Sequence, residues 1–147
     1  MRINTNMFKY WNKNKSEMVF LNITDLAKLE ENINIMQNIG VMTYRIGVDQ
    51  NAPDSDVEWI YEEDIVKLIY EDSIKGSSLE AYGIITELRD GSFMIDFPQY
   101  GTTTGIPYDD DYESLLLIGN IWDKESWKNI EDGELVKIIT EWMKDLI

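Results

Sequence analysis

The dipeptide Asp90-Gly91 constrains the fold of this chain more than any other short feature of the sequence. A type I′ turn needs positive φ at both central residues, and Asp-Gly between two runs of alternating apolar residues is typical of that turn. The sequence therefore predicts an antiparallel hairpin over residues 81–97. The predicted register pairs Arg89 with Ser92, Leu88 with Phe93, Thr86 with Ile95 and Ile84 with Phe97. The predicted buried face consists of Ile84, Leu88, Phe93, Ile95 and Phe97.

Apolar residues at spacings of three and four predict helices elsewhere in the chain. They are expected over about residues 24–38, about 61–72 and 133–147, the last of them capped by Asp132. A short helical turn within 122–130 is expected to position Trp127. Two runs rich in strand-forming residues, 18–21 and 41–48, predict strands.

The segment that follows the hairpin is polar and contains two glycines and two prolines. Pro98 is expected to end the second strand, since proline cannot donate to a sheet ladder. The run from Pro98 to Glu113 then suits a long shaped loop or a short edge strand. The largely apolar run Ser114–Ile118 is expected to be buried, whatever its secondary structure.

Together these elements favour an α+β fold rather than a doubly wound α/β fold, because strands and helices do not alternate regularly. We expect a mainly antiparallel sheet of about four to six strands, packed against two or three helices that include the C-terminal amphipathic one. Residues 1–147 are expected to form a single domain. Its first 16 residues form a basic N-terminal arm with four basic residues and no acid, which we expect to dock as a structural anchor.

Charge and composition exclude several classes of function. The chain has 13 Lys and Arg residues against 28 Asp and Glu, a net charge of −15, which disfavours direct binding of nucleic acid. It has no cysteine and no histidine, so disulfides, thiolate nucleophiles, Ser-His-Asp catalysis and sites with Cys or His ligands are excluded. No apolar run approaches the roughly 20 residues of a membrane span, and no signal peptide is recognised. We expect a cytoplasmic protein without a cofactor.

The six residues Tyr108–Glu113 are the most concentrated acidic cluster of the sequence. Three consecutive aspartates cannot all be buried without partners, so they face water, a metal or a basic ligand. One interpretation is a helix N-terminus before Ser114, where Asp offsets the positive end of the dipole. A calcium loop is a second interpretation, although the Gly and the distal bidentate Glu of an EF-hand are missing.

Paired carboxylates also permit general acid and base catalysis. With 28 acids on a small surface, however, neighbouring carboxylates are expected by chance. A phosphate cradle at Gly101–Gly105 would have neither the lysine nor the Walker spacing. We therefore expect no enzymatic activity.

A third interpretation combines the acidic cluster with the segment from Asp49 to Asp72, which has nine acids and one base, a net charge of −8. Aromatic anchors among carboxylates suit a protein interface, and the acids would steer a basic partner to it. A solvated acidic face kept for solubility is the simpler alternative. The candidate partner-binding residues are Asp54, Asp56, Glu58, Trp59, Tyr61, Glu62, Glu63, Tyr108, Asp109, Asp110, Asp111, Tyr112 and Glu113.

Small size, strong negative charge and aromatics among carboxylates resemble bacterial immunity proteins, the antidotes to toxins of contact-dependent growth inhibition and other polymorphic toxin systems. The run Gly105-Ile-Pro-Tyr108, with Asp111-Tyr112 and Leu115-Leu116, is similar to the Leu-Pro, Tyr and Leu pattern of the SUKH immunity superfamily. That pattern lies late in this chain and lacks the following Gly-Gly, so the resemblance extends to immunity proteins in general and not to this superfamily.

The resemblance implies inhibition by binding, in which the protein covers the active site or substrate groove of a cognate toxin, commonly a basic nuclease. An alternative is a phage or plasmid DNA mimic, whose carboxylates imitate duplex phosphates and block a host DNA-binding enzyme. Such mimics spread their charge over most of the surface. Here the acids concentrate in two stretches and the basic arm interrupts them, which favours the immunity protein.

Overall fold

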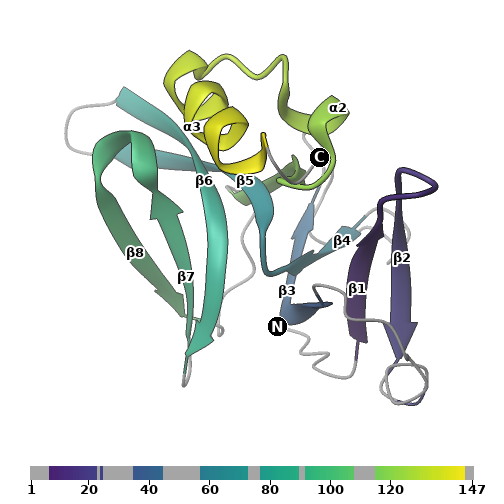
Figure 1. Cartoon of the computed structure of the whole chain (residues 1–147). Helices are drawn as coiled ribbons and strands as arrows, with labels where there is room; N and C mark the ends of the chain where they lie inside the picture. The colour runs from purple at the N-terminus through teal and green to yellow at the C-terminus, as the bar shows by residue number, and fades with distance from the viewer. Residues whose placement is uncertain are drawn as a thin grey trace.

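Two antiparallel sheets and two α-helices make up the described part of the computed structural model, as Figure 1 shows. The structure describes residues 7–22, 24, 35–44, 57–72, 77–89, 92–107 and 115–144. The expected α+β class is confirmed, because the strands pair antiparallel and the helices follow separately near the C-terminus.

The larger sheet has five strands in the order β8-β7-β6-β5-β9. Its strands are β5 Asp64–Asp72, β6 Ser77–Arg89, β7 Ser92–Phe97, β8 Thr102–Pro107 and β9 Leu115–Asn120. A 3-10 turn, η2 Pro98–Tyr100, joins β7 to β8. Pro98 thus ends β7 as predicted, and β8 is the short edge strand that was one of the two expectations for this segment.

The smaller sheet has four strands in the order β2-β1-β3-β4. Its strands are β1 Met7–Asn12, β2 Glu17–Asn22, β3 Ile35–Tyr44 and β4 Val57–Tyr61. The strand predictions at 18–21 and 41–44 are confirmed, and residues 45–48 lie outside the described part of the chain. Residues 7–12 of the basic arm form β1, an inner strand between β2 and β3.

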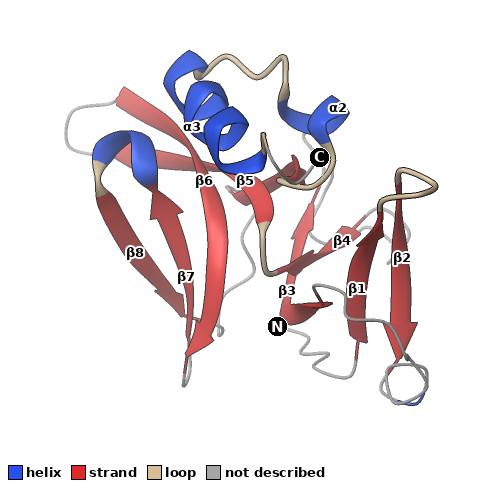
Figure 2. Ribbon diagram, in the orientation of Figure 1, coloured by secondary structure: helices blue, strands red, loops and turns tan. Residues whose placement is uncertain are grey.

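The two helices are α2 Lys124–Trp127 and α3 Gly133–Met143, and Figure 2 shows α3 lying across one face of the larger sheet. The helical turn around the buried Trp127 is confirmed as α2, and the C-terminal helix capped by the side chain of Asp132 is confirmed over 133–143. Residues 145–147 of the predicted helix lie outside the described part of the chain. Trp142 departs from the predicted apolar face of this helix, since 45% of it is exposed. Within the described ranges, no helix combines the length and apolar character that a membrane crossing requires.

Two hydrophobic cores lie on opposite faces of the larger sheet. Neighbouring residues point alternately into the two cores, as the period of a strand requires. The helix-side core consists of Met36, Tyr61, Ile65, Ile84, Trp122, Trp127, Leu135, Ile139 and Met143. The second core consists of Ile60, Val66, Ile85, Phe93, Ile95, Phe97 and Leu115.

The predicted hairpin is confirmed, and its register is correct close to the turn, where Arg89 pairs with Ser92 and Leu88 with Phe93. A bulge at Thr86 then shifts the ladder by one residue. Ile85, not Ile84, therefore joins the face of Phe93, Ile95 and Phe97. Ile84 is buried as expected, but in the helix-side core under α3.

The predicted helix over about 61–72 is wrong, because residues 64–72 form the strand β5. β5 is an inner strand between β6 and β9, and its residues Ile65 and Val66 are buried on opposite faces, each in one of the two cores. The sequence of a strand that is buried on both faces is a nearly continuous apolar run, and apolar residues at helical spacings occur in such a run by chance. The predicted helix over about 24–38 is wrong at 35–38, which belong to β3; residues 25–34 lie outside the described ranges.

A helix beginning in the acidic cluster before Ser114 is also wrong, because residues 115–120 form the strand β9. The burial predicted for this run is confirmed at Leu115 and Leu116. The cluster Tyr108–Glu113 itself lies outside the described residues.

We expect Asp132→Ala to destabilise the protein by about 1–2 kcal/mol, as is usual for a lost N-cap. Asp132 Oδ1 accepts a hydrogen bond from the backbone N–H of Leu135 at 3.1 Å, and Oδ2 accepts one from Gln99 Nε2 at 3.1 Å. Urea denaturation measures the change. Glu131→Ala, at the exposed neighbouring position, is the control and should have little effect; equal losses in both variants would show that the cap is unimportant.

Candidate functional site

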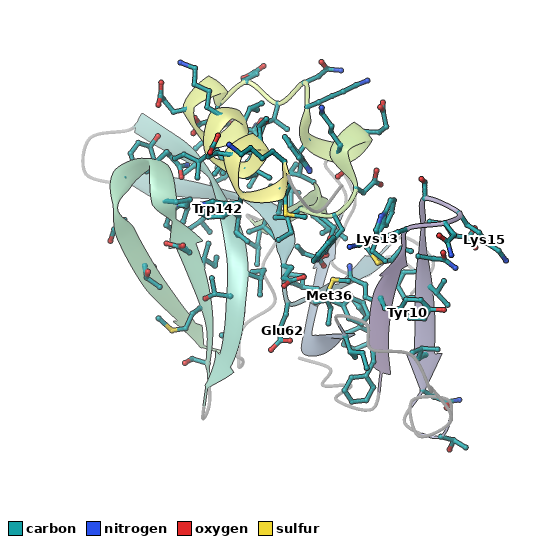
Figure 3. All side chains as sticks on the ribbon, in the orientation of Figure 1. Tyr10, Lys13, Lys15, Met36, Glu62 and Trp142 are labelled. Carbon is teal, nitrogen blue, oxygen red and sulfur yellow. The ribbon has the colours of Figure 1, made fainter. Side chains whose placement is uncertain are left out.

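The structure places five of the predicted partner-binding residues around β4 and the turn that follows it. Glu58 and Trp59 lie on β4, Tyr61 ends the strand, and Glu62 and Glu63 form the turn to β5. Figure 3 shows Glu62 on this turn, between the two sheets. The other predicted residues, Asp54, Asp56 and 108–113, lie outside the described part of the chain.

Tyr61 is a core residue and does not belong to an exposed surface, which corrects its assignment as a partner contact. It is 4% exposed and belongs to the helix-side core. Its ring lies 4.6 Å from Lys9 Nζ, a cation–π contact, and 5.8 Å from the ring of Phe20 in an edge-on arrangement. Trp59 is half-buried and packs against the same core.

A buried ion pair between Lys9 and Asp64 joins the two sheets. Lys9 is 5% exposed and Asp64 is fully buried, with Lys9 Nζ donating to Asp64 Oδ1 at 2.5 Å. The same oxygen accepts from Asn120 Nδ2 at 2.9 Å, and Oδ2 accepts from the backbone N–H of Tyr61 at 2.7 Å. Burial raises the pKa of the Asp64 carboxyl, while the charge of Lys9 and these hydrogen bonds oppose the rise.

Glu63 occupies a strained position next to this pair. Its φ of 69° lies in the left-handed region, which a residue with a Cβ rarely adopts. The strained backbone is held from two sides: its N–H donates to the carbonyl of Ile85 at 2.7 Å, and its carbonyl accepts from the N–H of Ile121 at 3.1 Å. The turn is therefore tied to both β6 and the end of β9.

The side chain of Glu63 fixes the indole of Trp122. Trp122 Nε1 donates to Glu63 Oε2 at 2.5 Å, and the backbone N–H of Trp122 donates to Asn120 Oδ1 at 3.0 Å. Burial raises the pKa of the Glu63 carboxyl above its ordinary value, and the hydrogen bond from Trp122 opposes that shift. Both the backbone and the ring of Trp122 are thus held in place.

An open groove of about 600 Å³ lies between the β1–β2 hairpin and the segment around α2. Trp11, Lys13 and Ser16 form the hairpin wall. Trp122, Asp123, Lys124 and Glu125 form the opposite wall. Grooves that combine aromatic surface with a few charged groups are the usual form of a binding site, so this is the candidate functional site of the described residues.

The hairpin wall is shaped by local hydrogen bonds. Asn12 Oδ1 accepts from the backbone N–H groups of Asn14 and Lys15, at 3.0 and 3.2 Å, which closes the turn after β1. Ser16 leaves the turn with a φ of 50°. Lys13 then reaches across the groove, with Nζ 5.5 Å from the centre of the Trp122 ring, and Figure 3 shows it turned toward the body of the molecule while Lys15 points away.

The opposite wall depends on Ser126. Its Oγ donates to the carbonyl of Asp123 at 2.6 Å and accepts from the N–H of Asn120 at 3.1 Å, which ties α2 to the end of β9. Gly119 permits this approach, since a Cβ there would overlap Ser126. Asp123 precedes α2 but makes no side-chain capping bond to it, and its side chain is half-buried at the groove.

The chemistry available in the groove is recognition by charge and aromatic surface. Among the residues that the structure describes, no three carboxylates come close enough together to hold a metal ion. The possible calcium loop at Asp109–Glu113 lies outside those residues. Glu63 has both a strained backbone and a raised pKa, but it faces the indole of Trp122 and does not line the groove.

The groove and the buried ion pair are two features that were not predicted from the sequence. Trp11 and Trp122 are too distant in the chain for any local pattern to bring them together. One signal was present for Lys9, a single basic residue inside the largely apolar run Met7-Phe-Lys-Tyr-Trp11. Such a residue on an inner strand needs an acidic partner, although the sequence does not say which one.

Comparisons with protein-family models, curated proteins and solved structures find no match for this chain. The assignment of the groove as the candidate functional site therefore rests on its geometry alone.

We expect Lys9→Met to destabilise the protein by about 3–5 kcal/mol, because it leaves Asp64 buried without its partner. The control is Lys67→Met, which removes a lysine that also pairs with a carboxylate, Glu80, and lies over a ring, Tyr82, but in a pair that is partly exposed. This control should lose at most about 1 kcal/mol. Chemical denaturation of both variants measures the difference, and similar losses would contradict a special role for the buried pair.

Glu63→Gln should change the pH dependence of stability. A carboxyl group whose pKa is higher in the folded protein than in the unfolded chain stabilises the fold below its unfolded pKa, and this contribution is lost as the pH rises through the folded pKa. Gln keeps an oxygen for Trp122 and removes the titration. The free energy of unfolding of the variant, relative to the original protein, should therefore increase as the pH rises above 4.5, the ordinary pKa of the group.

Thermal or urea unfolding at several pH values measures this difference. Glu134→Gln, at an exposed position on α3, is the matched control for the chemical change. A relative stability of Glu63→Gln that falls with rising pH would contradict the raised pKa.

Proposed function

We propose that this protein is a bacterial immunity protein that binds and neutralises a cognate toxin, of the basic nuclease type, in the cytoplasm. The observation that carries the proposal is the acidic excess of the chain, a net charge of −15 on 147 residues. A charge of this size favours encounter with basic partners and accelerates their association. In this proposal the protein acts by binding the toxin and performs no catalysis.

The distribution of charge supports binding at a surface. The described residues include nine lysines and arginines and sixteen carboxylates, which gives them a net charge of −7. The rest of the chain carries the remaining −8. On α2 and α3 the charges are balanced by pairs such as Lys128 with Glu125 and Lys144 with Glu141. The surface of α2 and α3 therefore attracts a basic partner less strongly than the acidic stretches do.

The position of β4 supports a contact through the first acidic stretch. In the described residues β4 pairs only with β3, so it is an edge strand of the smaller sheet. Trp59 on this strand is held by its packing against the helix-side core. A pre-ordered aromatic side chain flanked by carboxylates is the usual composition of an interface anchor, because little side-chain entropy is lost on binding.

The test is to mix the purified protein with the toxin domain encoded beside its gene and to measure the complex by calorimetry at low and moderate salt. The double variant Glu58→Lys, Glu62→Lys should weaken the complex by at least about tenfold. Glu134→Lys, Glu141→Lys is the matched control, since it changes the net charge equally on the outer surface of α3 and should leave the affinity nearly intact.

A further variant, Asp109→Lys with Asp111→Lys, shows whether the second acidic stretch takes part. Absence of any complex with the neighbouring gene product would reject the proposal. Equal loss in the control variant, together with inhibition of several unrelated DNA-binding enzymes, would indicate a DNA mimic instead.

A further inference from the structure

The groove between Trp11 and Trp122 already holds a cation of its own chain. Lys13 Nζ lies 5.5 Å from the centre of the Trp122 ring, within the range of a cation–π contact. Lys13 itself is exposed, whereas Trp122 is 6% exposed. The lysine thus covers a ring that is otherwise fixed in the protein.

We propose that this groove is a receptor site for an arginine side chain of a basic protein partner, which displaces Lys13 from the face of Trp122. The inference deepens the proposed function and rests on it for the identity of the partner. None of the residues that line this groove belongs to β4.

The walls of the groove are ordered before any ligand arrives. The hydrogen bond from Trp122 Nε1 to Glu63 fixes the ring, and Ser126 fixes the segment that carries Asp123. The hairpin turn is closed by the side chain of Asn12. A guanidinium group that enters this site would therefore contact side chains that are already ordered. Little conformational entropy of the protein would be lost when it binds.

The charges of the groove favour a cation once Lys13 has moved. Asp123 then remains as the half-buried carboxylate, with Lys124 exposed at the rim. Glu125 is 2.7 Å from Lys128 and contributes less, because its charge is compensated. An anionic ligand would have to approach against the net charge of −15.

Arginine is better suited to this site than lysine. Its planar guanidinium stacks on an indole and forms two parallel hydrogen bonds with a carboxylate, whereas lysine presents a strongly hydrated point charge. An incoming arginine can therefore use both Trp122 and Asp123, while Lys13 uses the ring. The exchange replaces one cation on the ring by another and leaves no buried charge unpaired.

The experiment uses a short peptide with one arginine and capped ends as the probe, titrated into the full chain and followed by the indole N–H signals in NMR. The signals of Trp11 and Trp122 should shift, whereas that of Trp142 should not, since Trp142 lies on α3 far from Lys13 (Figure 3). The same peptide with citrulline keeps the shape without the charge and should produce no shift.

Two variants test the exchange. Lys13→Met removes the competing cation and should bind the arginine peptide at least about threefold more tightly. Asp123→Asn should bind it at least about threefold more weakly. Lys137→Met, which removes an exposed lysine on α3, is the matched control for net charge and should leave the affinity within about 1.5-fold of the original, because screening weakens distant charges.

Weaker binding by Lys13→Met, equal binding of the citrulline peptide, or shifts spread over Trp142 would overturn the inference. Tighter binding of a mononucleotide than of the arginine peptide would also overturn it and would indicate an anion site. If the peptide binds as described but the neighbouring toxin domain forms no complex, the groove stands and the proposed function fails. If the complex forms but the peptide does not bind, the inference alone fails.

Discussion

The buried ion pair of Lys9 and Asp64 is the interaction on which the arrangement of the two sheets depends. Lys9 comes from β1 in the smaller sheet, and Asp64 begins β5 in the larger one. Asn120, at the end of β9, shares the same carboxylate. Because a buried charge is tolerated only with its partner, the pair admits one position of the N-terminal hairpin relative to the larger sheet. That position also sets the distance between the walls of the groove.

Features governed by local chemistry were predictable from the sequence. The hairpin pairing of Arg89 with Ser92 and the Asp132 cap each depend on residues within a few positions, and both are found where expected. The α+β class followed from the same local signals. β5 could not be recognised because a strand buried on both faces loses its alternation, and helical spacings appear in its apolar run. The bulge at Thr86 has no signal in residue type, since any residue can be the extra one in a ladder.

The candidate site was less predictable than the fold. Charge pointed to the acidic stretches, and in the described residues part of the first stretch is structural: Tyr61 is in the core and Glu63 holds Trp122. The groove unites a hairpin near the N-terminus with a helix near the C-terminus. Such a site depends on sheet topology, which a single sequence does not determine. The contact of Lys13 with the Trp122 ring likewise exists only in the folded chain.

The position of β1 has a consequence for how the chain is made. β1 leaves the ribosome before β5, and Lys9 pairs only after Asp64, 55 residues later, and Asn120 beyond it have been made. Contacts over such separations form late, because the entropy of closing the loop must be overcome before they stabilise anything. During synthesis the basic hairpin therefore exists without the acidic groups that will surround it. β1 emerges before the strands of the larger sheet and is among the last elements to reach its final environment.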